Sequence, residues 1–256
     1  MDSRGTNDEN NPLPWRKFVS ELIGTALLVL VGLSVVIIMF GTGGPVERVL
    51  PDVGLRRLIT GFLFGTTGAL IAISPLGKES GAHINPIVTL GFWLMGRMNS
   101  RVALWFVLAQ LAGAILGALP LLAWGSMGES VMFGATAPGK GYTLLTVFMG
   151  EAITTFVMIV GLCLFLGFRG LRPYTPAMFP PLYSVMVYAE SAISGTSTNP
   201  ARTIGPAVIS GEWQGWWIYW LGPVMGTLLA ALVCRRLAKR IEEAKLYHFG
   251  REDRVQ

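Results

Sequence analysis

The stretch GTSTNPARTIGP (residues 195–206) places Arg202 between two long apolar runs. A charged side chain near the centre of a bilayer costs about 2.5–3.5 kcal/mol on insertion scales, so an arginine there is expected to serve a function. Asparagine is a favoured helix N-cap and proline is favoured at the first helical position, so Asn199 and Pro200 predict the start of a helix. The apolar residues that follow, 200–210, can cross only half of a bilayer at about 1.5 Å per residue.

The same pattern occurs earlier in the chain, where Asn85 and Pro86 begin a second short apolar segment, 86–96. One Asn-Pro pair more often marks a surface turn. Two pairs at equivalent positions of a repeat are a much stronger signal. The repeated segments are GAHINPIVTLG (81–91) with GTSTNPARTIG (195–205), and SELIGTALLVLVG (20–32) with GEAITTFVMIVG (150–161).

The composition is typical of an integral membrane protein. Of 256 residues, 52% are hydrophobic and 14% are charged, and the mean hydropathy is +0.55, which is too apolar for an ordinary soluble domain. The net charge of +5 comes from residues scattered among short loops and the C-terminal tail, so no nucleic-acid interface is predicted. Cys163 and Cys234 lack Cys-x-x-Cys spacing and predict neither a disulfide nor a metal site. No cofactor is expected.

Six apolar runs approach the length of about 20 residues that a helix needs to cross the hydrocarbon. Basic residues at their ends fall mostly on one side, which should be the cytoplasm, with both termini there and the protein in the cell membrane. Arg56 and Arg57 fall on the opposite side. The expected spans are 18–40, 57–75, 102–124, 143–168, 176–193 and 214–234, and the basic groups are Arg16 and Lys17, Arg97 and Arg101, Arg169 and Arg172, and Arg235, Arg236, Lys239 and Arg240.

Each half of the chain contains three spans and one half-helix. Because three is odd, the second half must enter the membrane from the opposite side. The predicted fold is an all-α membrane protein with six transmembrane helices plus two re-entrant half-helices in an inverted repeat. Its expected parts are a disordered cytoplasmic tail (1–14), a channel domain (15–235, with repeats at about 15–125 and 143–235) and a cytoplasmic tail (236–256), which we expect to be a solvated extension.

In this arrangement the two half-helices start at the middle of the membrane. The stretches before them, 81–84 and 195–198, are expected to be extended, and non-helical backbone at this depth implies a water-filled path. Their carbonyls would accept hydrogen bonds from a permeating molecule, and the Asn85 and Asn199 amides would donate. The positive ends of both helices oppose cations, so the permeant should be neutral.

Arg202 should project from the second half-helix into the outer half of this path. The equivalent residue in the first repeat is Val88, so the charge lies on one side only. The outer half is therefore the expected constriction. The alternative is a surface arginine whose head group reaches the membrane interface.

Over about residues 15–235 the sequence resembles the aquaporin, or major intrinsic protein, family. The residues that carry the resemblance are SGAHINPIVTLG, SGTSTNPARTIGPA, Glu21 and Glu151. The resemblance implies a homotetramer in the lipid bilayer, with a pore for water, and for small neutral solutes in some members, through each subunit.

By this resemblance Asn85, Pro86, Asn199 and Pro200 form the pore centre. Arg202 and Thr196 belong to the outer selectivity filter. Phe64 corresponds to the aromatic filter member on the second helix, with Gly65 as the ungapped alternative. The fifth-helix member falls at Val187, with Tyr188 or Ala189 as alternatives. Water-selective relatives commonly have histidine there, so this filter is expected to be wider or less polar.

Other positions resemble the water branch of the family. The glycerol branch has aspartate after the filter arginine and a basic residue four positions on, where this chain has Thr203 and Ala207. Tyr219 and Trp220 also resemble the water branch. Ile87 departs from the family, which usually has alanine there, and leaves the pore width beside the central prolines open.

Four polar residues are expected to support the loops. Glu21 and Glu151 lie inside spans, and a buried carboxylate needs partners; in the family such residues accept hydrogen bonds from the re-entrant loops. His83 is expected to be a loop brace or a pore-lining donor rather than a metal ligand. For Glu190 two interpretations stay open, a brace for the 195–198 loop and an exposed acid at the rim.

The function predicted from these features is a passive channel for water, driven by osmotic gradients. The alternatives are an aquaglyceroporin-like channel for glycerol, urea, ammonia or hydrogen peroxide, and a secondary transporter built on the same repeat. An enzyme is not expected, because the spans contain no paired nucleophile and base.

Overall fold

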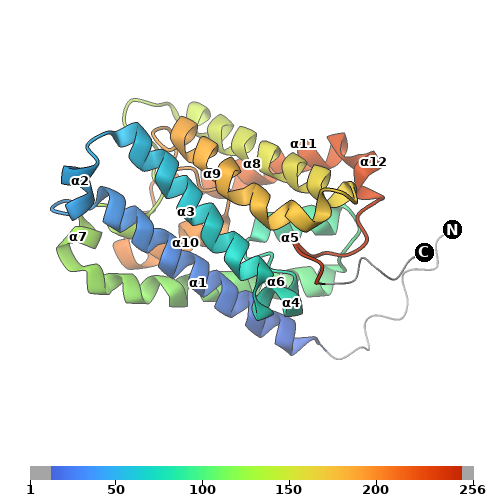
Figure 1. Cartoon of the computed structure of the whole chain (residues 1–256). Coiled ribbons are helices and arrows are strands. Elements are labelled where there is room, and N and C mark those ends of the chain that lie inside the picture. Colours follow the sequence, from blue (N-terminus) through green and yellow to red (C-terminus); the bar gives the residue numbers. More distant parts are fainter. Residues whose placement is uncertain (1–12, 250–256) are drawn as a thin grey trace.

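The computed structural model describes residues 13–249, in which every regular element is helical (Figure 1). The expected disordered tail, 1–14, lies almost wholly outside the described residues. The elements are α1 (Trp15–Phe40), α2 (Pro45–Val49), α3 (Val53–Ile73), α4 (Pro75–Ser80), α5 (Pro86–Leu94), α6 (Ser100–Ala118), η1 (Leu119–Trp124), α7 (Gly125–Glu129), η2 (Met132–Gly134), α8 (Leu144–Gly167), η3 (Arg172–Tyr174), α9 (Thr175–Glu190), α10 (Pro200–Ser210), α11 (Ile218–Val233) and α12 (Arg235–Ala238).

The expected spans correspond to α1, α3, α6, α8, α9 and α11. Four stretches, Trp15–Phe40, Val53–Ile73, Ser100–Glu129 and Leu144–Gly167, are long and apolar enough to cross a membrane by length and composition. The helices α9 and α11 have 16 residues each, which is shorter than expected. Each is preceded by a short turn, and α9 also contains Pro180 and Pro181.

The two ends of the bundle differ in what they carry. One end, here called the tail end, holds the start of α1 together with α4 and α12; the other, the loop end, holds α2 and α7 (Figure 1). All four basic groups used to orient the chain lie at the tail end. For example, Arg97 donates to Ala238 O at 2.9 Å, and Arg172 donates to Arg240 O at 2.6 Å.

Glycines let helices pack closely in equivalent pairs of the two repeats. A Cβ on Gly117 of α6 would lie 2.2 Å from Ala26 O of α1, and a Cβ on Gly226 of α11 would lie 2.2 Å from Ala152 O of α8. The third close pair, α3 with α9, joins the two repeats. There a Cβ on Gly61 would lie 2.3 Å from Tyr183 O. Small residues thus let the helix backbones approach closely. Such packing matters in a membrane because lipid supplies little hydrophobic driving force for helix association.

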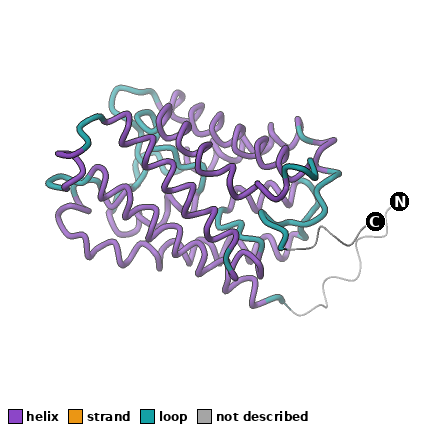
Figure 2. The backbone as a smooth tube through the Cα atoms, viewed as in Figure 1, coloured by secondary structure: helices purple, strands orange, loops and turns teal. Residues whose placement is uncertain are grey.

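The half-helices α5 and α10 begin at Asn85 and Asn199, as predicted. Both residues are N-caps in the extended region, at φ −157° and −150°, and each side chain accepts a hydrogen bond from the backbone of the following helix. Loop segments lie within the bundle between the helices (Figure 2). The half-helices therefore start inside the protein.

The loops before them are not extended, so that expectation is wrong. Four non-glycine residues have left-handed φ values: Ala82 (53°), Ile84 (44°), Thr196 (51°) and Thr198 (49°). Such a φ is strained for a β-branched residue. Ala82 is equivalent to Thr196 in the repeat, and Ile84 to Thr198. The conformation turns successive backbone amides toward one buried carboxylate in each half, as described below.

The expectation of a solvated C-terminal extension is also wrong for residues 239–249. The helix α12 ends at Ala238, and the chain after it folds back onto the tail end of the bundle. Ile241 is 1% exposed and Leu246 is 4% exposed. This segment buries apolar side chains against the helix bundle instead of leaving them in solvent. Residues 250–256 of the expected tail lie outside the described residues.

Candidate functional site

Asn85 and Asn199 meet at the centre of the bundle through reciprocal hydrogen bonds. Asn85 Nδ2 donates to Thr198 O at 3.0 Å, and Asn199 Nδ2 donates to Ile84 O at 3.1 Å. The Oδ1 atom of each asparagine caps its own helix, at Ile87 N (2.8 Å) and Ala201 N (3.0 Å). An amide group has two N–H donors, so each asparagine keeps one N–H that these contacts do not use.

Glu21 holds the first loop. Its two oxygens accept from His83 N at 3.0 Å and Ile84 N at 2.7 Å, and also from the side chains of Ser80 and Gln110, each at 2.7 Å. The carboxylate is fully buried. Four donors offset the cost of burying it and fix the loop in its left-handed conformation.

Glu151 holds the second loop in the same way. It accepts from Ser197 N at 2.7 Å, from Thr198 N at 2.8 Å and from the Ser194 hydroxyl. Ser194 Oγ in turn accepts from Thr196 N at 3.0 Å, as Ser80 Oγ accepts from Ala82 N at 3.1 Å. The inverted repeat is therefore preserved in its hydrogen bonds.

His83 lies where a loop brace is expected. One ring nitrogen, Nδ1, is 3.1 Å from Thr89 Oγ1, and the other, Nε2, is 2.9 Å from Ala244 O. Because a carbonyl only accepts, Nε2 carries the proton and Nδ1 accepts from the threonine. Within residues 13–249 no group of three or more metal-ligating side chains is present.

Glu190 is buried and bonded to the second loop. It is 5% exposed, and its Oε2 accepts from Thr196 Oγ1 at 2.6 Å. The burial and this contact favour the brace over the exposed acid at the rim.

Two cavities lie along the path, one lined by Arg202 and one by the asparagine pair. The first, here called the loop-end chamber, has a volume of about 260 Å³. Val187, Thr196 and Arg202 line it, as does Arg57. Arg202 is 6% exposed and donates from Nη1 to Gly134 O at 2.8 Å. A guanidinium has five N–H donors, so this single bond leaves others to face the chamber.

The second cavity, the tail-end chamber, is much smaller, at about 40 Å³, which is room for about one to three water molecules. Asn85 and Asn199 line it. Val88, the repeat equivalent of Arg202, also lines it, so the charge asymmetry predicted from the sequence is present. Leu246 of the C-terminal segment lies against the same chamber.

The alternatives for two candidate positions separate clearly. Phe64 lines both chambers. Gly65 lines only the tail-end chamber and presents no side chain to it; a Cβ there would lie 2.5 Å from Phe179 O. On α9, Val187 lines the loop-end chamber, whereas Tyr188 is 52% exposed on the outer face of the bundle. Ala189 is exposed as well.

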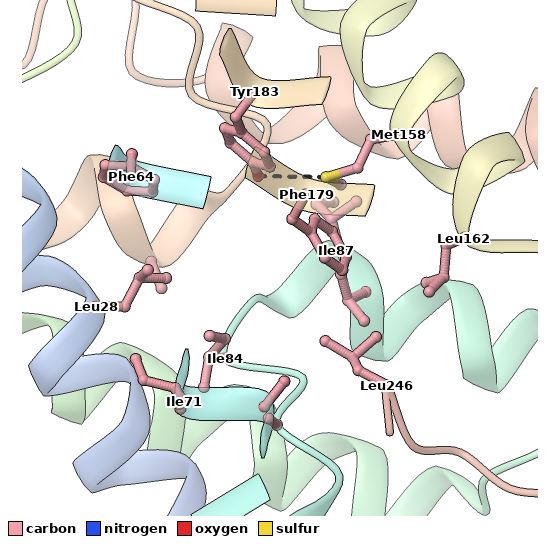
Figure 3. Packing of buried hydrophobic residues seen from close by; sticks show 14 of the residues in the cluster. Leu28, Phe64, Ile71, Ile84, Ile87, Met158, Leu162, Phe179, Tyr183 and Leu246 are labelled. Atoms are coloured by element: carbon pink, nitrogen blue, oxygen red, sulfur yellow. Dashed lines mark hydrogen bonds between the residues drawn. The ribbon is translucent and has the colours of Figure 1, made fainter. Parts of the chain in front are cut away.

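Sequence reasoning missed two residues of this site. Tyr183 lines both chambers. It precedes Val187 by four residues, so helical spacing would have placed both on one face. Leu246 lines the tail-end chamber from a segment that follows the last long helix, and no signal in the sequence indicated this. Ile87, by contrast, is packed in the core at 2% exposure and lines neither chamber (Figure 3).

The chain is similar to known proteins over most of its length. The profile of the family described as "Major intrinsic protein" matches residues 9–234. Aquaporin Z from Rhodopseudomonas palustris is 32% identical over 238 residues, which cover 87% of this chain and 93% of the relative. The lens fiber major intrinsic protein of Gallus gallus is 33% identical over 230 residues, covering 86% of this chain and 80% of the relative.

A solved structure supports the same fold. The aquaglyceroporin from Plasmodium falciparum superimposes with a TM-score of 0.69 at 19% identity, over 88% of this chain and 96% of that one. The predicted aquaporin-like fold is thereby confirmed. The profile match and the two relatives at 32% and 33% identity show that the chain belongs to the major intrinsic protein family, whose members are membrane channels for water or small solutes.

Proposed function

We propose that this protein is a passive water channel, driven by osmotic gradients, in which water passes in single file beside Arg202 and between Asn85 and Asn199. The observation that carries the proposal is the reciprocal pairing of the two asparagines, at 3.0 and 3.1 Å, beside the tail-end chamber. Each amide keeps one N–H, and a water oxygen can accept two hydrogen bonds. A water molecule there would be held by both amides.

The charges along the path favour a neutral permeant. The half-helices α5 and α10 direct their positive amino ends to the centre. Arg202 and Arg57 line the loop-end chamber. Both features oppose cations, including hydrated protons.

The roles of individual residues follow from this proposal. Phe64, Val187, Thr196 and Arg202 form the selectivity filter, and Asn85, Pro86, Asn199 and Pro200 form the pore centre. Glu21, Glu151, His83 and Glu190 support the loops.

The topology and assembly are part of the same proposal. The basic tail end faces the cytoplasm of the cell, in keeping with the excess of Lys and Arg on cytoplasmic loops. The subunits associate as homotetramers in the membrane.

A second candidate permeant class is small neutral solutes such as glycerol, urea, ammonia or hydrogen peroxide. The observation that favours it is the apolar Val187 in a loop-end chamber of about 260 Å³. The tail-end chamber of about 40 Å³ favours water.

The test is osmotic shrinkage of reconstituted vesicles, followed by stopped-flow light scattering. We expect wild-type vesicles to shrink several-fold faster than empty liposomes, and an Asn85→Leu/Asn199→Leu double variant to lose most of the gain. Wild-type rates equal to those of empty liposomes would reject the proposal. Isotonic uptake of glycerol and urea in the same vesicles decides between the two permeant classes.

A further inference from the structure

We propose that Tyr183 is a further specificity-determining residue, which forms an aromatic neck with Phe64 between the two chambers. The proposal rests on the proposed channel function. Both side chains line both chambers. Their rings are stacked with centroids 5.9 Å apart and planes inclined by 21° (Figure 3). The neck therefore lies between the Arg202 level and the asparagine pair.

Contacts on both sides fix the neck across the path. A Cβ on Gly32 of α1 would lie 2.5 Å from the Phe64 ring, so this ring fills the space up to α1. On the other side, Tyr183 Oη is 3.0 Å from Thr198 Oγ1 of the re-entrant loop and 3.3 Å from Met158 Sδ. A row of contacts thus runs from α1 through both rings to the second loop.

The neck also has a defined polarity. Thr198 Oγ1 donates its only proton to Ser197 O at 2.8 Å. Tyr183 therefore has one phenol proton for two acceptors, Met158 Sδ and Thr198 Oγ1, and its own oxygen is left as an acceptor. A permeating water meets donors at Arg202, an acceptor at Tyr183 and donors again at the asparagines. It must reorient between them, which opposes proton transfer along a chain of waters.

The proposed neck leads to two predictions about selectivity, one for the aromatic ring of Tyr183 and one for its phenol oxygen. The ring excludes molecules wider than water, so Tyr183→Ala is expected to raise the ratio of glycerol to water permeability several-fold. The phenol oxygen aids water alone, so Tyr183→Phe is expected to lower water permeability while glycerol stays excluded. The matched control is Tyr188→Ala, since that tyrosine lies on the outer face of the same helix at 52% exposure.

The experiment compares these three variants with wild type in vesicles, with water and glycerol fluxes measured on the same preparation. An unchanged ratio of glycerol to water permeability in a folded Tyr183→Ala variant would overturn the proposal of the neck. If that variant does not fold, Tyr183→Leu, which keeps an apolar side chain there, serves in its place. Should wild type conduct no water, conduction gained in Tyr183→Ala would still support the neck, and its absence would reject it.

A different part of the chain carries a second inference: we infer that residues 239–249 form a strap that closes the tail-end chamber. Leu246 is 4% exposed and lines this chamber together with His83 and Val88. Its backbone N–H donates to Gly81 O at 3.0 Å. The strap therefore places an apolar side chain at the end of the proposed water path, beside the first re-entrant loop.

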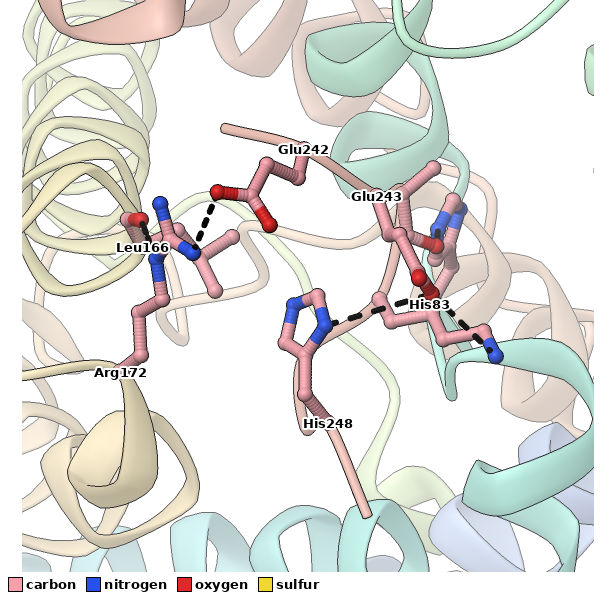
Figure 4. A network of polar contacts seen from close by, with 8 residues as sticks. His83, Leu166, Arg172, Glu242, Glu243 and His248 are labelled. Carbon is pink, nitrogen blue, oxygen red and sulfur yellow. Dashed lines mark hydrogen bonds and ion pairs between the residues drawn. The ribbon is translucent and has the colours of Figure 1, made fainter. Parts of the chain in front are cut away.

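Three further contacts hold the strap. Arg172 Nη1 pairs with Glu242 Oε1 at 3.1 Å (Figure 4). Arg172 Nη2 donates to Arg240 O at 2.6 Å. His83 Nε2 donates to Ala244 O at 2.9 Å. Glu242 is the most exposed anchor, with 63% of its side chain accessible, and an exposed ion pair contributes little stability. This one weak, exposed anchor suits a contact that opens and closes.

Two full-length variants test the strap. Leu246→Asp would bury a charge in the chamber, and Glu242→Lys would oppose Arg172; both are expected to release the strap. We expect faster hydrogen exchange at the amide of residue 246 and a several-fold rise in water permeability. The control is Lys239→Ala, at an exposed position just before the anchors.

The outcomes separate the strap from the channel function. Faster exchange without a gain in permeability would show that the strap does not obstruct the path. Unchanged exchange in both variants would show that residue 246 is not docked by these contacts, and would also overturn the inference. If wild type is inactive and the released variants conduct water, the proposal of an open channel in wild type is rejected, but the strap inference is supported.

Discussion

Glu21 and Glu151 each accept hydrogen bonds from two successive backbone amides, those of residues 83 and 84 in one loop and of residues 197 and 198 in the other. These four amides precede Asn85 and Asn199. The carboxylates therefore determine where the half-helices begin, although neither lines a chamber. The positions of the asparagines therefore depend on one residue in the first helix of each repeat.

Replacing Glu151 by Gln is expected to destabilise the second loop. One oxygen becomes an NH₂ group that faces backbone N–H donors, and an unsatisfied buried donor costs about 1–3 kcal/mol. We expect a lower melting temperature in detergent and a loss of water permeability. Glu129→Gln, at an exposed position in α7, is the control. Wild-type stability and flux in Glu151→Gln would mean that the carboxylate does not hold the loop.

Arg202→Val is expected to relax selectivity. The change removes the donor to Gly134 O and the buried positive charge in the loop-end chamber. Uptake of glycerol and leakage of monovalent cations should both rise, as measured in vesicles with isotonic solute and with a potential-sensitive dye. Arg169→Val, at an exposed arginine outside the chambers, should leave both unchanged. Equal selectivity in the two variants would exclude Arg202 from the filter.

Mercurial reagents are expected to inhibit the channel only weakly. The two free cysteines are buried, Cys163 at 0% and Cys234 at 2% exposure, and neither lines a chamber. The filter position in the second loop is Thr196, which has no thiol. Water permeability with and without mercuric chloride, in wild type and in Cys163→Ser, checks this. Strong inhibition that Cys163→Ser abolishes would contradict it.

The architecture could be predicted from the sequence because short sequence patterns mark the same features in both repeats. Asn-Pro pairs define two helix starts, and a buried carboxylate in each repeat requires nearby donors, so the half-helices and the roles of Glu21 and Glu151 as hydrogen-bond acceptors were predictable. Both carboxylates are found with those donors.

Other features depend on tertiary contacts that leave no local pattern. The backbone at Ile84 is left-handed because His83 N–H and Ile84 N–H both donate to Glu21. The conformational preference of isoleucine opposes this conformation. The docking of Leu246 depends on a hydrogen bond from its backbone N–H to Gly81 O, a residue in the first repeat and far earlier in the chain. Charge-rich flanks made the segment around Leu246 resemble a solvated tail.

Acidification is expected to release the strap. Burial lowers the pKa of His248 below its ordinary value of about 6.5. The positive charges of Arg172 and Lys245 lower this pKa further. The carboxylates of Glu243, 4.0 Å from His248 Nδ1, and of Glu242 act in the opposite direction and raise it. The docked strap therefore favours neutral histidine over the histidinium form. The docked strap has its full stability at pH values above the pKa of His248 in the released strap. This stability is lost as the pH falls through about 6.5 toward the lower pKa that His248 has in the docked strap.

Water permeability should therefore rise as the pH on the tail side of the vesicles falls from about 7.5 to about 5.5. His248→Gln, which cannot titrate, should remove this dependence. Lys239→Ala should retain it, because that residue lies outside the strap contacts described above. A pH response that persists in His248→Gln would assign the effect to another group, and a flat profile in wild type would show that histidine protonation does not release the strap.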